Sequence, residues 1–419
     1  MKSINEYIWN LKKGNMRRFY LLLCGLLLFN ITIHAQGGDD IQTTGAEATS
    51  NVLDYSVPFL TIAPDSRAGA LGDAGVATSP DNNSLHWNPA KYAFIDQDFG
   101  VSVSYTPWLR NLVNDIYLGY LIGHYRLDDE QVISGSLLYF SLGEMIFRNN
   151  IGDYAGQHIP NEFSVDLAYS RKFGDHFSGG VAFRYIRSDL TGGTFVSGTE
   201  TAAGNAVAAD VSVYYENKGL EISENVVDLR LGMNIRNIGS KISYSSIEEN
   251  FIPTNMKLGA SLDFHLDEYN SLMFTAELNK LLIPTPPIYA DTTNGTDEPV
   301  IVKGMDPEVS VTQGIFQSFY DAPGGFREEL QEIKYSFGLE YWYQNAFALR
   351  GGYFHEHEKK GNRKYFTVGL GVKLNVFRAD FAYLIPRYQN NPLANTMRFT
   401  LALDFEALKQ RRENQSAGN

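Results

Sequence analysis

The sequence predicts an all-β fold: a closed, antiparallel, transmembrane β-barrel of fourteen strands with an N-terminal plug. Three observations lead to this prediction. From residue 99 onward, apolar and polar residues alternate with a period of two, mostly in runs of about nine to twelve residues, which is the length that a tilted strand needs to cross a membrane. The runs number fourteen, an even count as in bacterial outer-membrane barrels. The connections between them alternate between short and long.

Residues 1–35 have the features of a secretory signal peptide. Two arginines at positions 17 and 18 precede an apolar run from Phe19 to Phe29, and Ala35 is the small residue expected before the cleavage site. This run is too short to span a bilayer. Residues 1–15 are unusual ahead of such a signal, so a true start at Met16 is an alternative. We expect a secreted mature chain that begins near Gln36.

The composition of the mature chain excludes several functional classes. Cys24 is the only cysteine, so cleavage leaves no thiol for a disulfide, a nucleophile or a zinc site. Removing residues 1–35 takes away five of 35 basic and one of 48 acidic residues, which leaves a formal net charge of about −17. This charge balance argues against nucleic-acid binding. The mature chain has no run of 18 apolar residues, which excludes transmembrane helices.

Residues 36–98 are expected to form an N-terminal periplasmic segment whose later part is a plug. Small residues and turn formers crowd residues 66–94, "SRAGALGDAGVATSPDNNSLHWNPAKYAF", without helical or strand periodicity. Irregular backbone persists at membrane depth only when protein surrounds it, so we expect this segment to fold up into the barrel. A flexible periplasmic leader is the alternative. The predicted plug residues are Asn82, Asn83, Trp87, Asn88, Pro89 and Ala90.

The barrel is predicted to span residues 99–405. Along one run, Leu229, Leu231 and Met233 alternate with residues such as Arg230, so one face should meet lipid and the other the lumen. The predicted strands are 99–106, 115–127, 131–141, 163–173, 177–187, 205–216, 227–236, 254–266, 270–281, 333–343, 346–354, 364–374, 376–385 and 396–405. The charged residues expected to line the lumen include Arg184, Arg230, Asp263, Glu277, Glu340 and Arg398.

The lengths of the connections predict the orientation of the barrel. Outer-membrane barrels have short periplasmic turns and longer extracellular loops, and here the even-numbered connections are short, apart from a sixth of middling length at 217–226. Both termini are therefore expected in the periplasm. The last strand, "MRFTLALDF", ends at Phe405 like an outer-membrane assembly signal, and residues 406–419 are expected to form a periplasmic tail.

The connection 282–332 is by far the longest and is predicted to bind a protein partner. Structureless loops beyond about 12 to 15 residues are usually functional or disordered, and the aromatic content of this loop argues against disorder. Asp321 to Gly325 is expected to separate two short helices, and Glu328, Glu329 and Lys334 to form a polar exposed flank. A lid with aromatics packed over the barrel mouth is the alternative. The predicted binding residues are Ile315, Phe316, Phe319, Tyr320, Asp321, Pro323, Gly324, Gly325 and Phe326.

No catalytic, metal-binding or cofactor-binding constellation is predicted. His355 and His357 lie at the tip of a hairpin among charges, where a solvated loop is favoured over a metal site. Residues 291–298, "DTTNGTDE", lack the spacing and the terminal glutamate of an EF-hand calcium loop. His86, beside Trp87, is expected to be a packing residue of the plug. Nothing assembles a nucleophile, a base and an orienting group.

Two stretches carry a resemblance to known families. "SPDNNSLHWNPAKYAF" resembles the Asn-Pro-Ala motif in the N-terminal hatch of the FadL family of fourteen-stranded outer-membrane transporters. The longer stretch "FLTIAPDSRAGALGDAGVATSPDNNSLHWNPAKYAF", together with "GIFQSFYDAPGGFREELQEIKYSFGLEYWY", resembles the PorV family, the FadL-like barrels of the Bacteroidetes type IX secretion system. The resemblance extends over essentially the whole mature chain.

The resemblance implies a role in protein transport and no enzymatic activity. Members of the PorV family associate with the large translocon barrel, capture cargo proteins through their C-terminal targeting domain and deliver them to the cell-surface sortase complex. The implied partners are therefore the translocon barrel, cargo C-terminal domains, a surface sortase subunit and outer-membrane lipid, with no nucleic acid. The alternative is a FadL-type channel for hydrophobic small molecules, which needs an apolar path through the barrel and an opening in its wall.

Overall fold

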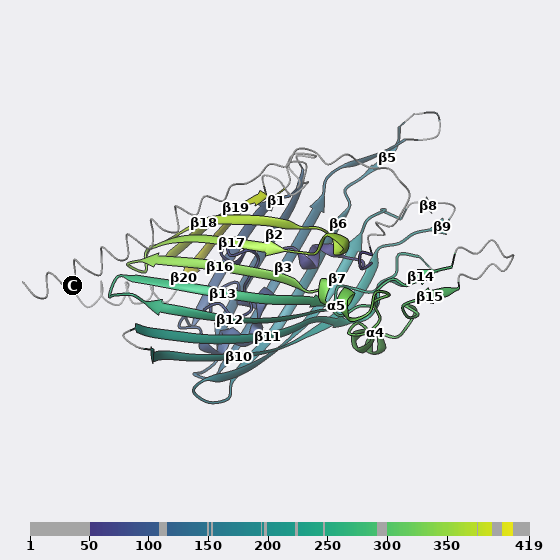
Figure 1. Ribbon diagram of the computed structural model, residues 1–419. Helices are drawn as coiled ribbons and strands as arrows, with labels where there is room; N and C mark the ends of the chain where they lie inside the picture. Colours follow the sequence, from purple (N-terminus) through teal and green to yellow (C-terminus); the bar gives the residue numbers. More distant parts are fainter. Residues whose placement is uncertain are drawn as a thin grey trace, which may run out of the picture. The chain divides into compact units, whose positions relative to one another are not determined.

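Within the residues that the structure describes, fourteen antiparallel strands pair in chain order, and the last pairs with the first to close a barrel (Figure 1). The computed structural model describes residues 51–108, 115–148, 151, 154–193, 195–196, 199–222, 225–245, 248–290, 300–374, 376–387 and 396–404, all within the unit Thr49–Asn419. The predicted signal peptide, residues 291–298, Phe405 and the tail 406–419 lie outside these residues. None of the described helices is long and apolar enough to cross a membrane.

The strands of the barrel agree closely with the predicted runs, so the predicted closed antiparallel barrel of fourteen strands is confirmed. They are β1 (Phe99–Pro107), β2 (Ile116–Arg126), β3 (Gln131–Leu142), β6 (Asn161–Lys172), β7 (Phe177–Asp189), β10 (Gly204–Ile222), β11 (Asn225–Gly239), β12 (Asn255–His265), β13 (Asn270–Leu281), β16 (Lys334–Tyr343), β17 (Phe347–His355), β18 (Lys364–Leu374), β19 (Phe377–Pro386) and β20 (Met397–Asp404).

Shorter elements lie in the long connections and before the first strand. The connections carry β4 (Met145–Arg148), β5 (Tyr154–His158), β8 (Phe195–Val196), β9 (Thr199–Glu200), β14 (Ile288–Tyr289), β15 (Ile301–Lys303), α4 (Val311–Gln317), α5 (Phe326–Gln331) and η3 (Glu358–Lys360). The segment before β1 contains η1 (Pro58–Thr61), α2 (Ser66–Gly69), α3 (Ser84–Trp87) and η2 (Pro89–Phe94). We call the end of the barrel with the long connections the loop end and the opposite end the turn end.

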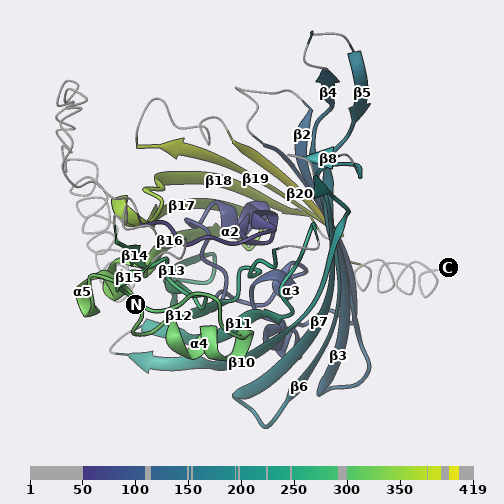
Figure 2. The ribbon, with the colours of Figure 1, turned by 90° about the vertical axis from the view of Figure 1, so that its right-hand side faces the viewer.

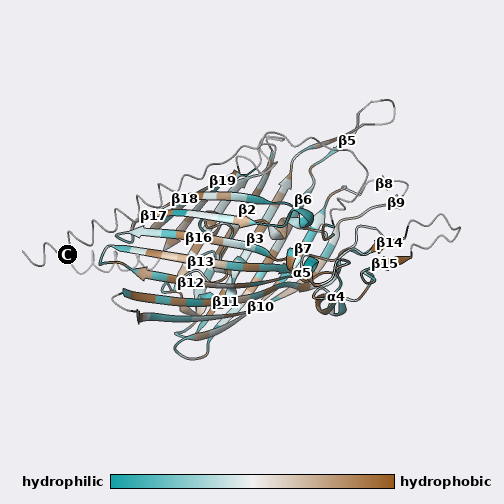
Figure 3. Cartoon of the chain, viewed as in Figure 1, coloured by the Kyte–Doolittle hydropathy of each residue, from teal (hydrophilic) through white to brown (hydrophobic). Residues whose placement is uncertain are grey.

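The pleat of the strands separates a lipid-facing surface from the lumen. On β11, Leu231 is 45% exposed, whereas Arg230 is only 4% exposed and faces inward. The same alternation of exposed and buried positions runs along β3, β6 and β7, and apolar and polar colours alternate along the strands in Figure 3. Successive residues of a strand point to opposite faces, so the period-two pattern in the sequence yields the predicted register directly.

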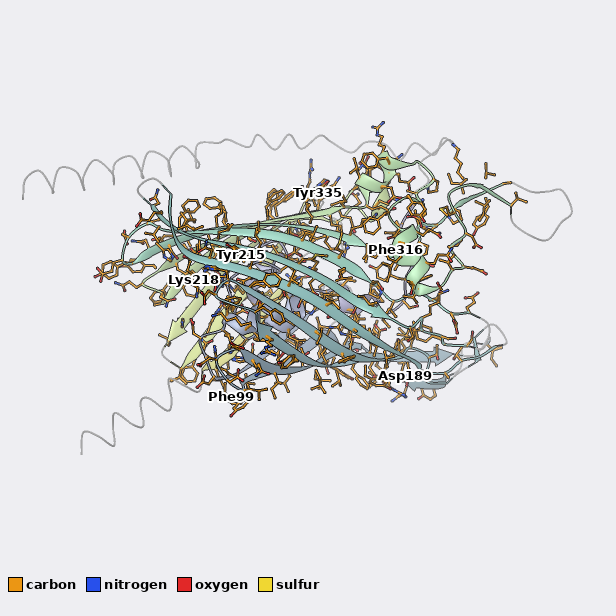
Figure 4. All side chains as sticks on the ribbon, turned by 90° about the horizontal axis from the view of Figure 1, so that it is seen from below. Phe99, Asp189, Tyr215, Lys218, Phe316 and Tyr335 are labelled. Carbon is orange, nitrogen blue, oxygen red and sulfur yellow. The ribbon has the colours of Figure 1, made fainter. Side chains whose placement is uncertain are left out.

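Exposed aromatic side chains form a girdle near the turn end. Outer-membrane barrels carry such girdles where the apolar band meets the membrane interfaces. In Figure 4, Phe99 lies near the turn end, and Asp189 and Phe316 lie toward the loop end. The exposed aromatic residues near the turn end are Phe99, Tyr125, Phe173, Phe177, Tyr269, Tyr343, Phe347 and Phe377.

Two details of the connections differ from the prediction. The middling connection expected at 217–226 is mostly strand, because β10 continues to Ile222 through a bulge between Asn217 and Leu220. Gly219 supplies the positive φ of 74° at this bulge, a backbone conformation that glycine adopts without steric cost. The hairpins β4–β5, β8–β9 and β14–β15 were not predicted. Their strands have two to five residues, too few for a clear alternation.

The segment before β1 lies inside the ring of strands, where α2 and α3 are visible in the view from the loop end (Figure 2). Its apolar residues, including Phe59 and Leu85, pack against inward-facing residues such as Leu138 and Ile186. The first described residues, 51–57, lie at the loop end, because Asn51 hydrogen-bonds to Pro286 and Glu328. They therefore do not support the expectation of an N-terminus at the turn end. The terminus itself lies outside the described residues.

Candidate functional site

The predicted plug residues are held against the lumen wall by side-chain and backbone hydrogen bonds. Asn88 begins η2 as its N-cap, with its Oδ1 accepting from the N–H of Ala90, and Pro89 fits the first position of that helix. The Asn88 Nδ2 donates to the carbonyls of Val76 and Val213, both at 3.0 Å. Ser170 on β6 donates to the carbonyl of Pro89 at 2.7 Å. The Asn-Pro-Ala turn thus joins the segment to three strands, β6, β7 and β10, because Ser178 and Ser212 bond to Ala90.

Trp87 is 3% exposed and contacts two charged side chains, one at its ring nitrogen and one over its ring. Its Nε1 donates to Asp65 Oδ1 at 2.6 Å, and the Nζ of Lys257 lies 4.4 Å from its ring centroid. His86 packs edge-on against it, with 4.9 Å between ring centroids. Asn83 is buried as well, and Asn82 donates weakly to the carbonyl of Val101 at 3.4 Å. The six predicted plug residues therefore lie together inside the barrel.

Arg67 links this segment to the barrel through a bidentate ion pair. Its guanidinium donates to both carboxylate oxygens of Glu340 on β16, at 3.0 and 2.7 Å, and to Asp81 at 3.0 Å. Glu340 also accepts from Arg350 on β17, which donates in turn to Asp380 on β19 at 2.7 Å. Bidentate arginine–carboxylate pairs are among the strongest hydrogen-bonded contacts in proteins. The sequence gave no indication of this role, because Arg67 and Glu340 lie 273 residues apart.

The inward-facing charges form ion pairs instead of lining an open channel. Arg184 donates to Asp166 at 2.7 Å and to Asp210 at 3.1 Å. Arg230 donates to Glu216 at 2.8 Å and to Asp228 at 2.9 Å. The charged residues that were predicted to line the lumen do face inward, but most of them are buried. Buried charges are costly unless paired, so this pairing offsets the cost of burying the charges in the filled lumen.

Glycines of the strands allow the segment to touch the wall. A Cβ at Gly352 would overlap the backbone nitrogen of Gly72, and a Cβ at Gly232 would overlap the carbonyl oxygen of Val76. Such positions require glycine because another backbone approaches closely. At the turn end, a cavity of about 520 Å³ remains between the segment and the wall, lined by charged residues such as Asp81 and Arg230.

Of the nine predicted binding residues of the long connection, four are exposed aromatics at the loop end, whereas Asp321 is buried. Phe316 is 66% exposed, Phe319 45%, Tyr320 64% and Phe326 77%, and Figure 4 shows Phe316, a residue of α4, toward the loop end. Ile315 is half-buried. We call Phe316, Phe319, Tyr320 and Phe326 the aromatic surface. This exposure does not fit the alternative of a lid with its aromatics packed over the barrel mouth.

The acidic side of α5 faces the barrel. Glu329 and Lys334, which were predicted to be exposed, are buried. Lys280 at the end of β13 pairs with Glu329 at 2.9 Å and with Glu332 at 2.6 Å. Lys360 of η3 pairs with Glu328 at 2.6 Å and again with Glu332 at 2.9 Å. Glu329 is 6% exposed, and Lys334, which pairs with Glu356, is 7% exposed. The expectation of a polar exposed flank was therefore wrong for these two residues: their charges are paired inside and the aromatics face outward.

The turn between α4 and α5 is fixed by local hydrogen bonds. Asp321 accepts from the N–H of Thr285 at 3.0 Å, and burial raises the pKa of its carboxyl to about 6. The N–H of Gly324 donates to Glu328 Oε2 at 2.7 Å. Gly325, with a φ of 67°, precedes α5, and its N–H donates to the carbonyl of Ala322 at 2.8 Å. Pro323 completes this turn. The connection is thus held by hydrogen bonds between the two helices that carry the aromatic surface.

The other residues considered for chemistry show structural roles. The Nε2 of His86 lies 3.2 Å from Nη1 of Arg236, and His86 is buried. His357 caps η3 by accepting from the N–H of Lys359 at 3.3 Å. Among the described residues, no group of three or more His, Cys, Asp or Glu side chains is placed to hold a metal ion.

Several solved structures with a similar course of the chain are distant in sequence. The Pseudomonas putida toluene transporter TodX is 11% identical, with 81% of this chain and 96% of that chain covered and a TM-score of 0.46. The Ralstonia pickettii toluene transporter TbuX is 10% identical, with 81% and 96% covered and a TM-score of 0.41. A Pseudomonas aeruginosa FadL homologue is 10% identical, with 82% and 98% covered and a TM-score of 0.39. Among curated proteins, no match was found.

A family comparison is more informative than these structures. The family described as "Type IX secretion system protein PorV" matches residues 45–288. This match includes the segment inside the lumen and the strands from β1 to β13. It covers more than half of the 419 residues. The chain therefore belongs to the PorV family of type IX secretion system proteins.

Proposed function

We propose that this outer-membrane barrel of the type IX secretion system is a cargo carrier that works at its extracellular surface. In this proposal it binds the large translocon barrel, captures cargo proteins through their C-terminal targeting domain and delivers them to the surface sortase complex. Membership in the PorV family supports a role in this secretion system. The aromatic surface supports a protein-binding role for the loop end.

The proposed orientation places the turn end in the periplasm and the loop end outside the cell. Outer-membrane barrels have short periplasmic turns and longer extracellular loops, and the short connections 128–130, 174–176 and 267–269 all lie at the turn end. β20 also ends there, because its last residues pair with the start of β1. In this orientation α4, α5 and the aromatic surface face the cell exterior.

The segment 51–98 is proposed to close the lumen as a plug. Its support is the set of contacts described above: the Arg67 ion pairs, the Asn-Pro-Ala turn bonded to three strands, and close backbone approaches at Gly232 and Gly352. A FadL-type channel for hydrophobic molecules requires an apolar path, whereas the inward positions near this segment carry charges such as Glu277 and Glu340. These contacts favour the carrier over the channel.

The observation that carries the proposal is the reversed arrangement of the 282–332 connection. Glu328, Glu329 and Glu332 are paired with lysines of the barrel side, at the cost of ordering and desolvating them, while the four aromatic side chains of the aromatic surface are left in solvent. Exposed apolar clusters mark interaction sites, and aromatic anchors supply much of the energy of protein interfaces. A protein partner that covers the aromatic surface explains both features.

We predict that Phe316→Ala combined with Phe319→Ala weakens capture of the translocon or cargo without unfolding the barrel. Truncating a central interface aromatic costs about 2 kcal/mol or more, so copurification should fall roughly tenfold or more. The barrel should remain heat-modifiable in gels, because both side chains are exposed. The measurement is affinity purification from solubilised outer membranes, with quantification of the bound proteins.

A matched control is the double variant Phe173→Ala and Phe177→Ala. These two aromatic side chains are exposed like Phe316 and Phe319, but they lie at the turn end. This control should copurify partners like the unchanged protein. If the α4 variant retains its partners and secretion continues at the normal rate, the aromatic surface is not the binding surface.

A further inference from the structure

The described chain begins at the loop end of the barrel, opposite to the end at which β1 begins. The Asn51 side chain donates to the carbonyl of Pro286 at 3.2 Å and to Glu328 at 2.9 Å. Leu53 packs with Leu281 and Ile283, where β13 ends. The N–H of Ser56 donates to the carbonyl of Phe251 at 2.9 Å. All of these partners belong to the long connections or to strand ends beside them.

From there the chain runs through the lumen to the turn end. The carbonyl of Ala63 accepts from Arg398, near the loop-end start of β20. Farther along, Val76 and Ala77 bond to Glu277 and Ser261 in the middle of the barrel. At the turn end, the carbonyl of Asp98 accepts from the N–H of Arg126 at 2.7 Å, and β1 begins. The segment therefore traverses the barrel from one mouth to the other.

Residues 51–54 also contribute to the surface of the loop-end mouth. Val52 is 45% exposed, and Asp54 is exposed as well, while Leu53 between them is buried. Asn51 lines a groove of about 610 Å³ together with Arg327 and Glu328 of α5 and residues of η3. The start of the described chain is thus built into the same face as α5, and its fixed contacts distinguish it from a loose leader.

We propose that residues 51–54 belong to the extracellular face of the protein, so that the chain enters the lumen from outside the cell and reaches the periplasm at β1. This inference rests on the orientation proposed above. It assigns the N-terminal segment a second role besides filling the lumen, because it forms one wall of the external groove beside α5. A secretory signal releases the mature chain on the periplasmic side, so the segment has to pass the plane of the outer membrane while the barrel closes around it.

The test uses single cysteines and a maleimide that does not cross membranes. Cleavage of the predicted signal removes Cys24, so the mature chain contains no other cysteine. The test variants are Val52→Cys and Asp54→Cys. Glu308→Cys, an exposed position in the 282–332 connection, marks the loop end, and Asp129→Cys, an exposed position in the first short turn, marks the turn end. Labelling is measured in intact cells, in lysed cells and on the purified barrel.

We expect Val52→Cys and Asp54→Cys to be labelled in intact cells to a similar extent as Glu308→Cys, and Asp129→Cys only after lysis. If Glu308→Cys reacts in intact cells while positions 52 and 54 react only after lysis, the inference is wrong although the orientation holds. If instead Asp129→Cys reacts in intact cells and Glu308→Cys does not, the proposed orientation itself fails. If the cysteines at positions 52 and 54 stay unlabelled even on the purified barrel, the inference is also overturned, because these positions are then not exposed.

Discussion

Replacing Arg67 with methionine is expected to lower the free energy of unfolding by about 3 to 5 kcal/mol, the usual cost of breaking a buried ion pair from one side. Arg67 is 4% exposed, and its loss leaves the partly buried Asp81 without its 3.0 Å partner. Glu340 loses two hydrogen bonds and keeps only Arg350. The same change should release the segment from the wall and raise the conductance of the barrel in planar bilayers.

The measurement is denaturant unfolding in lipid vesicles together with single-channel recording. Arg171→Met is a matched control, because Arg171 pairs with Glu130 at 3.4 Å on the surface, where both side chains are about half exposed. Surface pairs contribute about 0 to 1 kcal/mol. If Arg67→Met and Arg171→Met give the same unfolding midpoint and the same conductance as the unchanged protein, Arg67 does not hold the segment in place.

Leu231→Arg is expected to destabilise the barrel by roughly 2 to 4 kcal/mol, because it places a charge in the hydrocarbon near the middle of β11. Leu231 is 45% exposed on the lipid-facing side. Leu374→Arg provides the control: Leu374 is equally outward-facing but lies at the end of β18 at the turn end, where the cost falls to about 0 to 1 kcal/mol. Equal losses for the two variants in lipid refolding would contradict the assigned depth of Leu231.

The strands and their register were predictable from the sequence because a single physical constraint acts on every residue of the wall. Each strand has lipid on one side and protein on the other, so the period-two pattern directly identifies which side chains face inward. Arg230 shows the limit of this reasoning. The pattern places it in the lumen correctly, but it carries no information about which side chains it pairs with there. In the structure Arg230 holds Glu216, Asp228 and Asp263, so its removal should cost several kcal/mol.

The parts that could not be predicted depend on contacts between residues far apart in the chain. Glu329 and Lys334 are charged residues of the kind expected on an exposed surface. Only the folded structure brings Glu329 to Lys280 and Lys334 to Glu356. The direction in which the segment 51–98 runs through the lumen has no local signal either, since it is set by the contacts of Asn51 at the opposite mouth. Local patterns identify elements, whereas pairing of charges and the path of irregular backbone arise from the tertiary structure.

The central claim is that the aromatic surface binds protein partners of the secretion system. The most direct test replaces Tyr320, which is 64% exposed, with a photo-crosslinking amino acid and irradiates living cells. The same substitution at Tyr269, 51% exposed at the turn end, serves as the control. The account predicts adducts with the translocon barrel or with cargo proteins from position 320 and not from position 269. Abundant barrel with no protein adduct at position 320, in cells that secrete normally, would contradict it.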